Sequence, residues 1–185
     1  MTRESALTLI DKYITDGSIK KHLFATEAIM KALANRLRED EKEWALTGLL
    51  HDLDYMETKS NFEKHGFRTV EILKEEGFTI PNNMAKAIIA HACHPGWEPQ
   101  TLLEKALYAT DPLSGLVVAA ALIHPDKKLS SIDTTFIMKR FKEKRFAAGA
   151  DRNQIKSCES FGLTLEEFIS IGLIAMSNIA EVLGL

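Results

Sequence analysis

Apolar residues recur at helical spacing along nearly the whole chain, and no stretch of five or more residues alternates strictly between apolar and polar positions as a half-buried strand would. This pattern predicts an all-α fold of roughly eight or nine helices. In chain order, we expect helices over residues 3–15, 19–38, 41–51, 61–76 and 81–94, onward from about 101, over 132–145, and onward from about 152 and 164.

Several residues predict where helices begin, bend and end. Asn61 could cap the fourth helix, Gly77 would stop it, and Pro81 suits the first turn of the fifth. Pro112 falls inside the sixth helix, and because proline removes an intrahelical hydrogen bond we expect a kink or a division there. The 185 residues contain no repeat, low-complexity segment or interdomain linker, so a single domain over residues 1–185 is expected.

Composition and charge narrow the classes of function. Apolar residues make up 45% and charged residues 26%, and the net charge of -3 gives no overall attraction to a nucleic-acid polymer or an anionic membrane. The longest apolar run, Leu116–Ile123, is too short to span a bilayer, and the N-terminal residues lack the apolar stretch of a signal peptide. Cys93 and Cys158 form no CxxC pattern, which favours a reducing, cytoplasmic location over a disulfide framework.

The first candidate chemistry is the adjacent pair His51 and Asp52, which directly follows the apolar end of the third predicted helix. Burying an unpaired carboxylate costs several kcal/mol or forces its protonation. Asp52 therefore needs a cation or a strong set of hydrogen-bond donors. A divalent metal would satisfy both residues, and the alternative is an internal polar network that binds nothing.

Further candidate ligands lie on apolar-rich helical stretches, at His22, His65, His91, His94 and Asp111. A mixture of imidazole and carboxylate suits iron, manganese, zinc or nickel better than magnesium or calcium, which prefer an all-oxygen shell. The sequence leaves the choice among these transition metals open.

The order of His22, then the His51-Asp52 pair, then Asp111, all on predicted helices, resembles the H…HD…D signature of the HD superfamily of metal-dependent phosphohydrolases. This resemblance covers residues 20–115, about half of the chain. It implies an HD-type helical fold, in which a metal-binding core over about 20–115 is covered by C-terminal helices from residues 130–185.

Two further motifs extend the resemblance. Lys64-His65-Gly66 and the segment Ala87–His91 resemble the extra histidine positions of superfamily members with two metals. Leu102–Asp111 resembles the final ligand helix of small bacterial HD proteins similar to the symmetrical dinucleoside-tetraphosphate hydrolases.

The sequence also departs from two named subfamilies. Leu53-Asp54 stands where the HDIG variant has Ile-Gly, and Tyr55 stands where the dinucleoside hydrolases often have lysine. No GYP-type motif follows, which disfavours a cyclic-dinucleotide phosphodiesterase of that subclass. The resemblance therefore supports the metal site more firmly than it supports any particular substrate.

The resemblance implies one metal with four ligands, His22, His51, Asp52 and Asp111. It implies a second metal held by His65 and His91, with Asp52 bridging. Two such ions, about 3.5 to 4 Å apart, would activate water and stabilise charge at phosphorus. The alternative for His65 and His91 is direct binding of substrate phosphate around a single metal, and His94 reads equally well as a helix terminus.

Four more residues are candidates for catalysis or substrate binding. Asp54 could orient the attacking water or donate a proton to the leaving group, a role open to Asp52 as well. Arg68, three residues after His65 on the same predicted helix face, could bind phosphate or pair with nearby glutamates. The run from 139 to 145 carries a local charge of +4 and could be an anion-attracting flap with Lys144 and Arg145, or a solvated helix face.

Together these features predict a phosphohydrolase that uses metal-activated water on a small, nucleotide-like phosphoester or phosphoanhydride. Its cofactor would be one or two divalent transition-metal ions. The expected partner is a small phosphorylated metabolite or nucleotide, with no membrane and no nucleic-acid polymer, and with a homodimer as an open alternative. Two other function classes stay open: a metal-containing module that senses a nucleotide without turnover, and a di-iron, oxygenase-like enzyme.

Overall fold

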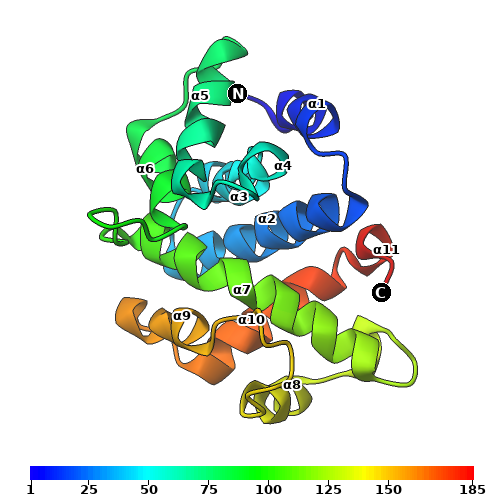
Figure 1. The fold of residues 1–185 in the computed structure, drawn as a ribbon. Helices are drawn as coiled ribbons and strands as arrows, with labels where there is room; N and C mark the ends of the chain where they lie inside the picture. The colour runs from blue at the N-terminus through cyan, green and yellow to red at the C-terminus, as the bar shows by residue number, and fades with distance from the viewer.

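The computed structural model describes residues 1–185 and contains helices and no β-strand (Figure 1). The longer helices are α1 (Arg3–Tyr13), α2 (Gly17–Leu37), α3 (Glu41–Leu50), α5 (Phe67–Glu75), α6 (Asn82–Ala90), α7 (Leu102–Ile123), α8 (Thr134–Phe141) and α10 (Leu165–Ser177). Short helices complete the fold: α4 (Tyr55–Thr58), α9 (Arg152–Lys156), α11 (Ala180–Leu183), and the 3-10 turns Phe62–Lys64, Leu129–Ser131 and Ser157–Phe161. The eight longer helices confirm the predicted all-α fold and the predicted number of helices.

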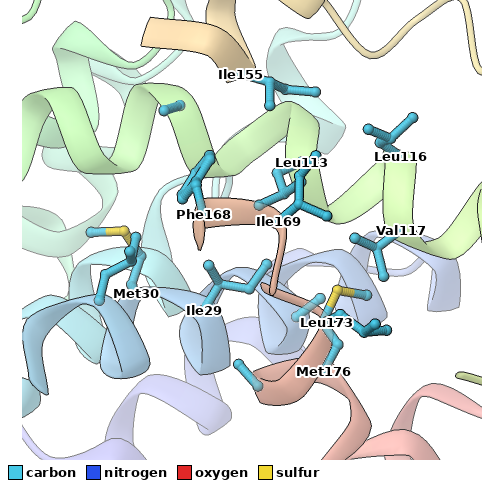
Figure 2. Packing of buried hydrophobic residues seen from close by; sticks show 14 of the residues in the cluster. Ile29, Met30, Leu113, Leu116, Val117, Ile155, Phe168, Ile169, Leu173 and Met176 are labelled. Carbon is cyan, nitrogen blue, oxygen red and sulfur yellow. The ribbon is translucent and has the colours of Figure 1, made fainter. Parts of the chain in front are cut away.

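Two clusters of buried apolar side chains lie on either side of α2. The larger, of 29 residues, joins α2 to α7, α9 and α10, and Figure 2 shows Ile29 of α2 beside Leu113 of α7 and Ile169 of α10. The smaller, of 13 residues, joins the start of α2 to α1, α3, α5 and α6. Apolar burial drives this packing, and it places α2 between the two groups of helices seen in Figure 1.

Helices α2 and α3 approach closely at Gly48. A Cβ atom added to Gly48 would lie 2.9 Å from the backbone oxygen of Thr26, closer than real Cβ contacts come. Glycine therefore lets the end of α3 lie against α2. This contact brings His51, which follows α3 directly, to the same place as His22 on α2.

The predicted helix over 61–76 is wrong in its first part. The chain makes a 3-10 turn at Phe62–Lys64, is extended at His65, and begins α5 only at Phe67. Gly66 causes the break, because its φ of 78° lies in the left-handed region that favours glycine. His65 consequently lies on a link before α5, and the expectation that Arg68 shares a helix face with it is wrong.

Two other predicted helices end early. The helix expected over 81–94 ends at Ala90, so His91 caps it and His94 lies in the following turns. The helix expected over 132–145 ends at Phe141, and the next nine residues form successive turns.

Helix α7 is continuous through Pro112, so a division there is excluded. Proline has no N–H group, which leaves the carbonyl oxygen of Tyr108, four residues earlier, without its helical donor. The side-chain amide of Gln154, on α9, donates to this oxygen over 2.8 Å. A tertiary hydrogen bond thus replaces the one that Pro112 removes.

By length and apolar composition, α7 is the one helix that could cross a membrane. More than half of its most apolar stretch is buried inside the protein, where α7 packs against α2, α6 and α9. Core packing therefore explains its apolar character.

Candidate metal centre

Polar side chains from four helices and one link meet where α2, α3, α6 and α7 come together. His22 lies on α2, His51 and Asp52 follow α3, His91 follows α6, and Asp111 lies on α7. His65 joins them from the extended link before α5. The fold thereby brings together all six residues predicted as metal ligands.

A first triad consists of His22, His51 and Asp52, whose ligand atoms lie within 4.8 Å of one another. The two Nε2 atoms of His22 and His51 are 3.1 Å apart. Asp111 adjoins this triad, with its Oδ1 atom 3.2 Å from His22 Nε2 and 3.8 Å from His51 Nε2. His22 and Asp111 are partly exposed, so this end of the cluster faces solvent.

A second triad consists of Asp52, His65 and His91. The Oδ1 atom of Asp52 lies 3.1 Å from His65 Nε2 and 3.2 Å from His91 Nε2, and these two nitrogens are 3.1 Å apart. All three residues are buried. Asp52 therefore belongs to both triads and lies between them.

The ring orientations turn the Nε2 atoms of His51 and His91 toward the cluster. The Nδ1–H group of His51 donates to the Gly48 carbonyl over 2.8 Å, and that of His91 donates to the Ile88 carbonyl. A carbonyl oxygen only accepts hydrogen bonds, so Nδ1 carries a proton and Nε2 is the nitrogen that can offer a lone pair to a metal.

Ser114 has the same effect on His22, and the sequence did not single it out. Its hydroxyl donates to the Asp111 carbonyl over 3.0 Å, and it therefore accepts the Nδ1–H of His22 over 2.8 Å. Ser114 follows Asp111 by one helical turn on α7, and this spacing could have indicated that it lies near the cluster. A serine in a helix seldom indicates a site, however. Nε2 of His22 thus faces the cluster as well.

Asp54 orients the fourth histidine. Its Oδ1 atom accepts the Nδ1–H of His65 over 2.8 Å, and its Oδ2 atom accepts the backbone N–H groups of Gly66 and Thr69 over 2.7 and 3.1 Å. Both oxygens are therefore occupied behind His65, and Asp54 does not face the cluster. Carboxylates in this position fix the tautomer of metal-binding histidines.

The neighbouring histidines lower the pKa values of both carboxylates. Burial raises the pKa of Asp52, but the adjacent His51 ring and hydrogen bonds from His65 and His91 outweigh burial and hold this pKa well below its usual range. The pKa of Asp111 is likewise lowered, because the His22 and His51 rings outweigh burial. Burial would lower the pKa of His65, yet hydrogen bonds to Asp52 and Asp54 raise it to about 10.

This donor set fits divalent transition metals. Four imidazole Nε2 atoms face each other in two pairs 3.1 Å apart, beside two carboxylates whose pKa values are lowered. Such an arrangement repels itself unless protons or cations lie within it. Mixed nitrogen and oxygen ligands with oriented second ring nitrogens are the pattern of iron, manganese, nickel and zinc sites.

A family model described as HD domain matches residues 19–116, just over half of the chain. The chain belongs to the HD-domain family. This match confirms the resemblance to the HD superfamily, whose members are generally metal-dependent hydrolases, and the matched residues include all six members of the cluster. No curated protein and no solved structure gave a significant match to the chain.

Two further residues of the HD domain lie near the cluster without facing it. His94 donates from Nε2 to the His65 carbonyl over 2.8 Å and stacks on Phe67, so it supports the backbone of a candidate ligand. Arg68 forms ion pairs with three surface carboxylates of Glu57, Glu71 and Glu75. The structure shows no contact between the Arg68 guanidinium and the cluster.

The solvent-facing end of the cluster opens into a hollow of about 360 Å³. Its walls come from α2, from α7 and from the turns after α8, namely His22, Asp111, Pro112, Gly115, Ala147, Gly149 and Ala150. Lys144 and Arg145 lie just before these wall residues, are exposed, and pair with no carboxylate. The turns that follow the cationic run therefore form part of the hollow beside the cluster, although they lie outside the family match.

Proposed function

We propose that this HD-domain protein is a metal-dependent phosphohydrolase acting on a small, nucleotide-like phosphoester or phosphoanhydride. One observation carries the proposal: the Nε2 atoms of four histidines and two carboxylates of lowered pKa meet in one cluster that opens to solvent at His22 and Asp111. Membership of a family of metal-dependent hydrolases supports assigning this cluster to hydrolysis.

The two triads support two metal sites. The outer site would be held by His22, His51, Asp52 and Asp111, and the inner site by Asp52, His65 and His91. Iron, manganese, nickel and zinc are the candidates. When bound, such ions supply a water of lowered pKa and neutralise charge developing at phosphorus.

The protein's own residues divide into binding and positioning roles. Asp52 lies between the triads, where it would orient the attacking water. That water would lose a proton as its oxygen forms the new bond to phosphorus and the bond to the leaving oxygen breaks, and the leaving oxygen would take up a proton in turn, so that the step balances. Asp54 is assigned as a positioning residue for His65 in place of a proton donor, because both of its oxygens are already occupied.

The hollow beside the outer site supports a small substrate. Its volume of about 360 Å³ falls at the lower end of the range of about 300 to 1,000 Å³ common for small-molecule sites. The exposed cations Lys144 and Arg145 would attract a phosphorylated molecule to this opening. Dinucleoside tetraphosphates belong among the candidates, although Tyr55 stands in place of the lysine often found in those hydrolases.

The cysteines and the net charge bear on the location of the protein and on its partners. Two free thiols, Cys93 and Cys158, suit a reducing compartment, and we propose the cytoplasm. The net charge of -3 supports a small-molecule partner over a nucleic-acid polymer. A homodimer is a further proposal, which sedimentation would decide.

The test is a metabolite screen with manganese-, iron- and nickel-loaded protein, scored by phosphate release and by metal content. We expect release from at least one nucleotide or phosphorylated metabolite, and loss of both bound metal and turnover in Asp52→Ala. His91→Gln should lose metal as well. His124→Gln is the matched control, because His124 lies outside the cluster and pairs only with Asp126 at the surface.

Three results would overturn the proposal. Protein without transition metal after metal-replete expression would leave the cluster as a polar network. Metal-loaded protein that binds nucleotides but releases no phosphate across the screen would indicate a sensor. Turnover that requires oxygen and stops under anaerobic conditions would indicate an oxygenase.

A further inference from the structure

The turns between α8 and α9 form one wall of the hollow beside the outer metal site. Ala147, Gly149 and Ala150 line this hollow opposite His22 and Asp111. In Figure 1 this segment leaves α8 and passes beside α7 before it enters α9. Residues 130–185 thus contribute to the opening of a site whose candidate ligands all lie before residue 112.

These turns have little regular structure of their own. Two backbone hydrogen bonds, from Phe146 to Glu143 and from Ala150 to Ala147, tie them internally. Ala147 has a φ of 44°, in the left-handed region that costs a residue with a Cβ atom energy. Such a segment needs a support from outside to keep one conformation.

Arg152, in the first turn of α9, provides that support. Its guanidinium donates to the carbonyl oxygens of Phe141 and Ala147 over 3.3 and 2.7 Å, and also to those of Phe146 and Ala150. Its charged carbon lies 5.7 Å from the centre of the Phe141 ring. No carboxylate lies within ion-pairing distance of Arg152, so its guanidinium hydrogen-bonds to the backbone of these turns instead of pairing with an acidic side chain.

Arginine suits this role better than lysine does. Its planar fork presents five N–H donors in fixed directions, whereas a lysine ammonium presents three from a single point. Four carbonyl oxygens spread over residues 141–150 can be reached together only by such a fork. Hydrogen bonds from a charged donor are also stronger than those from a neutral one.

We propose that Arg152 is a positioning residue that holds the 142–150 turns as the outer wall of the substrate site, where Lys144 and Arg145 recognise a phosphate group. This inference rests on the proposed function for the identity of the ligand. It adds that a segment outside the family match recognises the phosphate group. It also adds that the Arg152 side chain determines the shape of that segment.

The first measurement is hydrogen exchange of residues 142–150 in Arg152→Lys and Arg152→Gln. We expect residues 142–150 to exchange faster in both variants, and the increase to be larger in the glutamine variant. Exchange in α2 and α7 and the manganese content should stay as in the wild type. Arg36→Lys is the matched control, since Arg36 is an exposed arginine paired with Glu167 away from the hollow. Unchanged exchange of the turns in both Arg152 variants would overturn the role of Arg152.

The second measurement is calorimetric titration of the manganese-loaded protein with inorganic phosphate, the product of the proposed reaction. We expect the dissociation constant to rise about tenfold in Arg152→Lys and in Lys144→Ala/Arg145→Ala, the change that a loss of about 1.4 kcal/mol produces. With a substrate from the screen, KM should rise while kcat stays close to wild type. Faster exchange with unchanged phosphate affinity would show that the wall takes no part in recognition.

Failure of the proposed function has a different signature. If the wild-type protein hydrolyses no phosphoester, a phosphate group is no longer the expected ligand of the hollow. The exchange experiment would still decide whether Arg152 holds the turns. Normal hydrolysis in wild type with no effect of any variant on KM would overturn this inference alone.

Discussion

Ser114 decides which nitrogen of His22 faces the cluster, because it accepts the Nδ1–H of that ring. We expect Ser114→Ala to weaken manganese binding about 10- to 100-fold, the usual effect of removing a partner of a metal-binding histidine. Competition titration against a metal indicator would measure it, and Ser114→Thr should retain binding.

Ser177→Ala is the matched control for this substitution. Its hydroxyl also donates to a backbone oxygen of its own helix, that of Leu173, but α10 carries no ligand. Equal metal affinity in wild type, Ser114→Ala and Ser177→Ala would show that Ser114 does not orient His22.

Gly66 sets the position of His65 against α6. Its φ is 78°, and an added Cβ atom would lie 2.6 Å from the backbone oxygen of Ile88. Gly77 has the same φ of 78° but nothing within 4 Å of an added Cβ atom. We expect Gly77→Ala to lose about 1 kcal/mol of unfolding free energy through the backbone alone, and Gly66→Ala to lose about 1 to 3 kcal/mol more.

Urea unfolding of the two variants would measure this difference. Equal losses would show that the backbone of α6 yields to the added methyl group. A larger loss in Gly66→Ala, together with weaker metal binding, would show that the close approach is needed to place His65.

At the scale of helices, the pairing of Gln154 with the Tyr108 carbonyl keeps α7 continuous at Pro112. We expect Gln154→Ala to lose about 1 to 3 kcal/mol of unfolding free energy, since it leaves a partly buried carbonyl without a donor. In a Pro112→Ala background the helix supplies its own N–H group, and the same substitution should cost much less. A double-mutant cycle measured by urea unfolding gives the coupling, and additive losses would contradict it.

The sequence predicted most helices because their apolar spacing is a local property. The fourth predicted helix was wrong at its start, since the pattern over 61–76 is helical and only the tertiary contact of Gly66 with α6 shows why the chain breaks there. The continuity of α7 was equally hidden, because the donor that repairs Pro112 comes from Gln154, 46 residues from the carbonyl that it satisfies.

The sequence predicted the candidate ligands of the site but not the groups that orient them. Histidines and aspartates on apolar stretches are conspicuous, so all six cluster residues were identified from the sequence and the structure brings them together. The partners that orient the rings were missed, because serine and backbone carbonyl groups are common everywhere. Asp54 was noticed for its closeness to Asp52 in sequence, yet its side chain lies behind His65.

For the whole molecule, a bound metal should stabilise the fold, because it binds the assembled cluster and not the unfolded chain. At a concentration about 100 times its dissociation constant, a single ion adds about 2.7 kcal/mol to the unfolding free energy. For a protein of this size we expect the melting temperature to rise by about 5 to 10 °C. Thermal unfolding with and without manganese would measure the rise.

Asp52→Asn should abolish this stabilisation, since Asp52 belongs to both triads. Asp126→Asn, in the exposed turn after α7, is the control and should keep it. A rise of equal size in both variants would place the stabilising ion elsewhere.

The unequal burial of the two triads has a kinetic consequence for two bound ions. Two ligands of the outer position are partly open, with the His22 side chain 20% and the Asp111 side chain 31% exposed, whereas those of His65 and His91 are 4% and 2% exposed. A chelator could reach an ion at the outer position directly, whereas an ion at the inner position would leave only after the outer position is vacated or the helices separate. Metal release should therefore be biphasic, and the slow phase should report how often α6 and α3 part from each other.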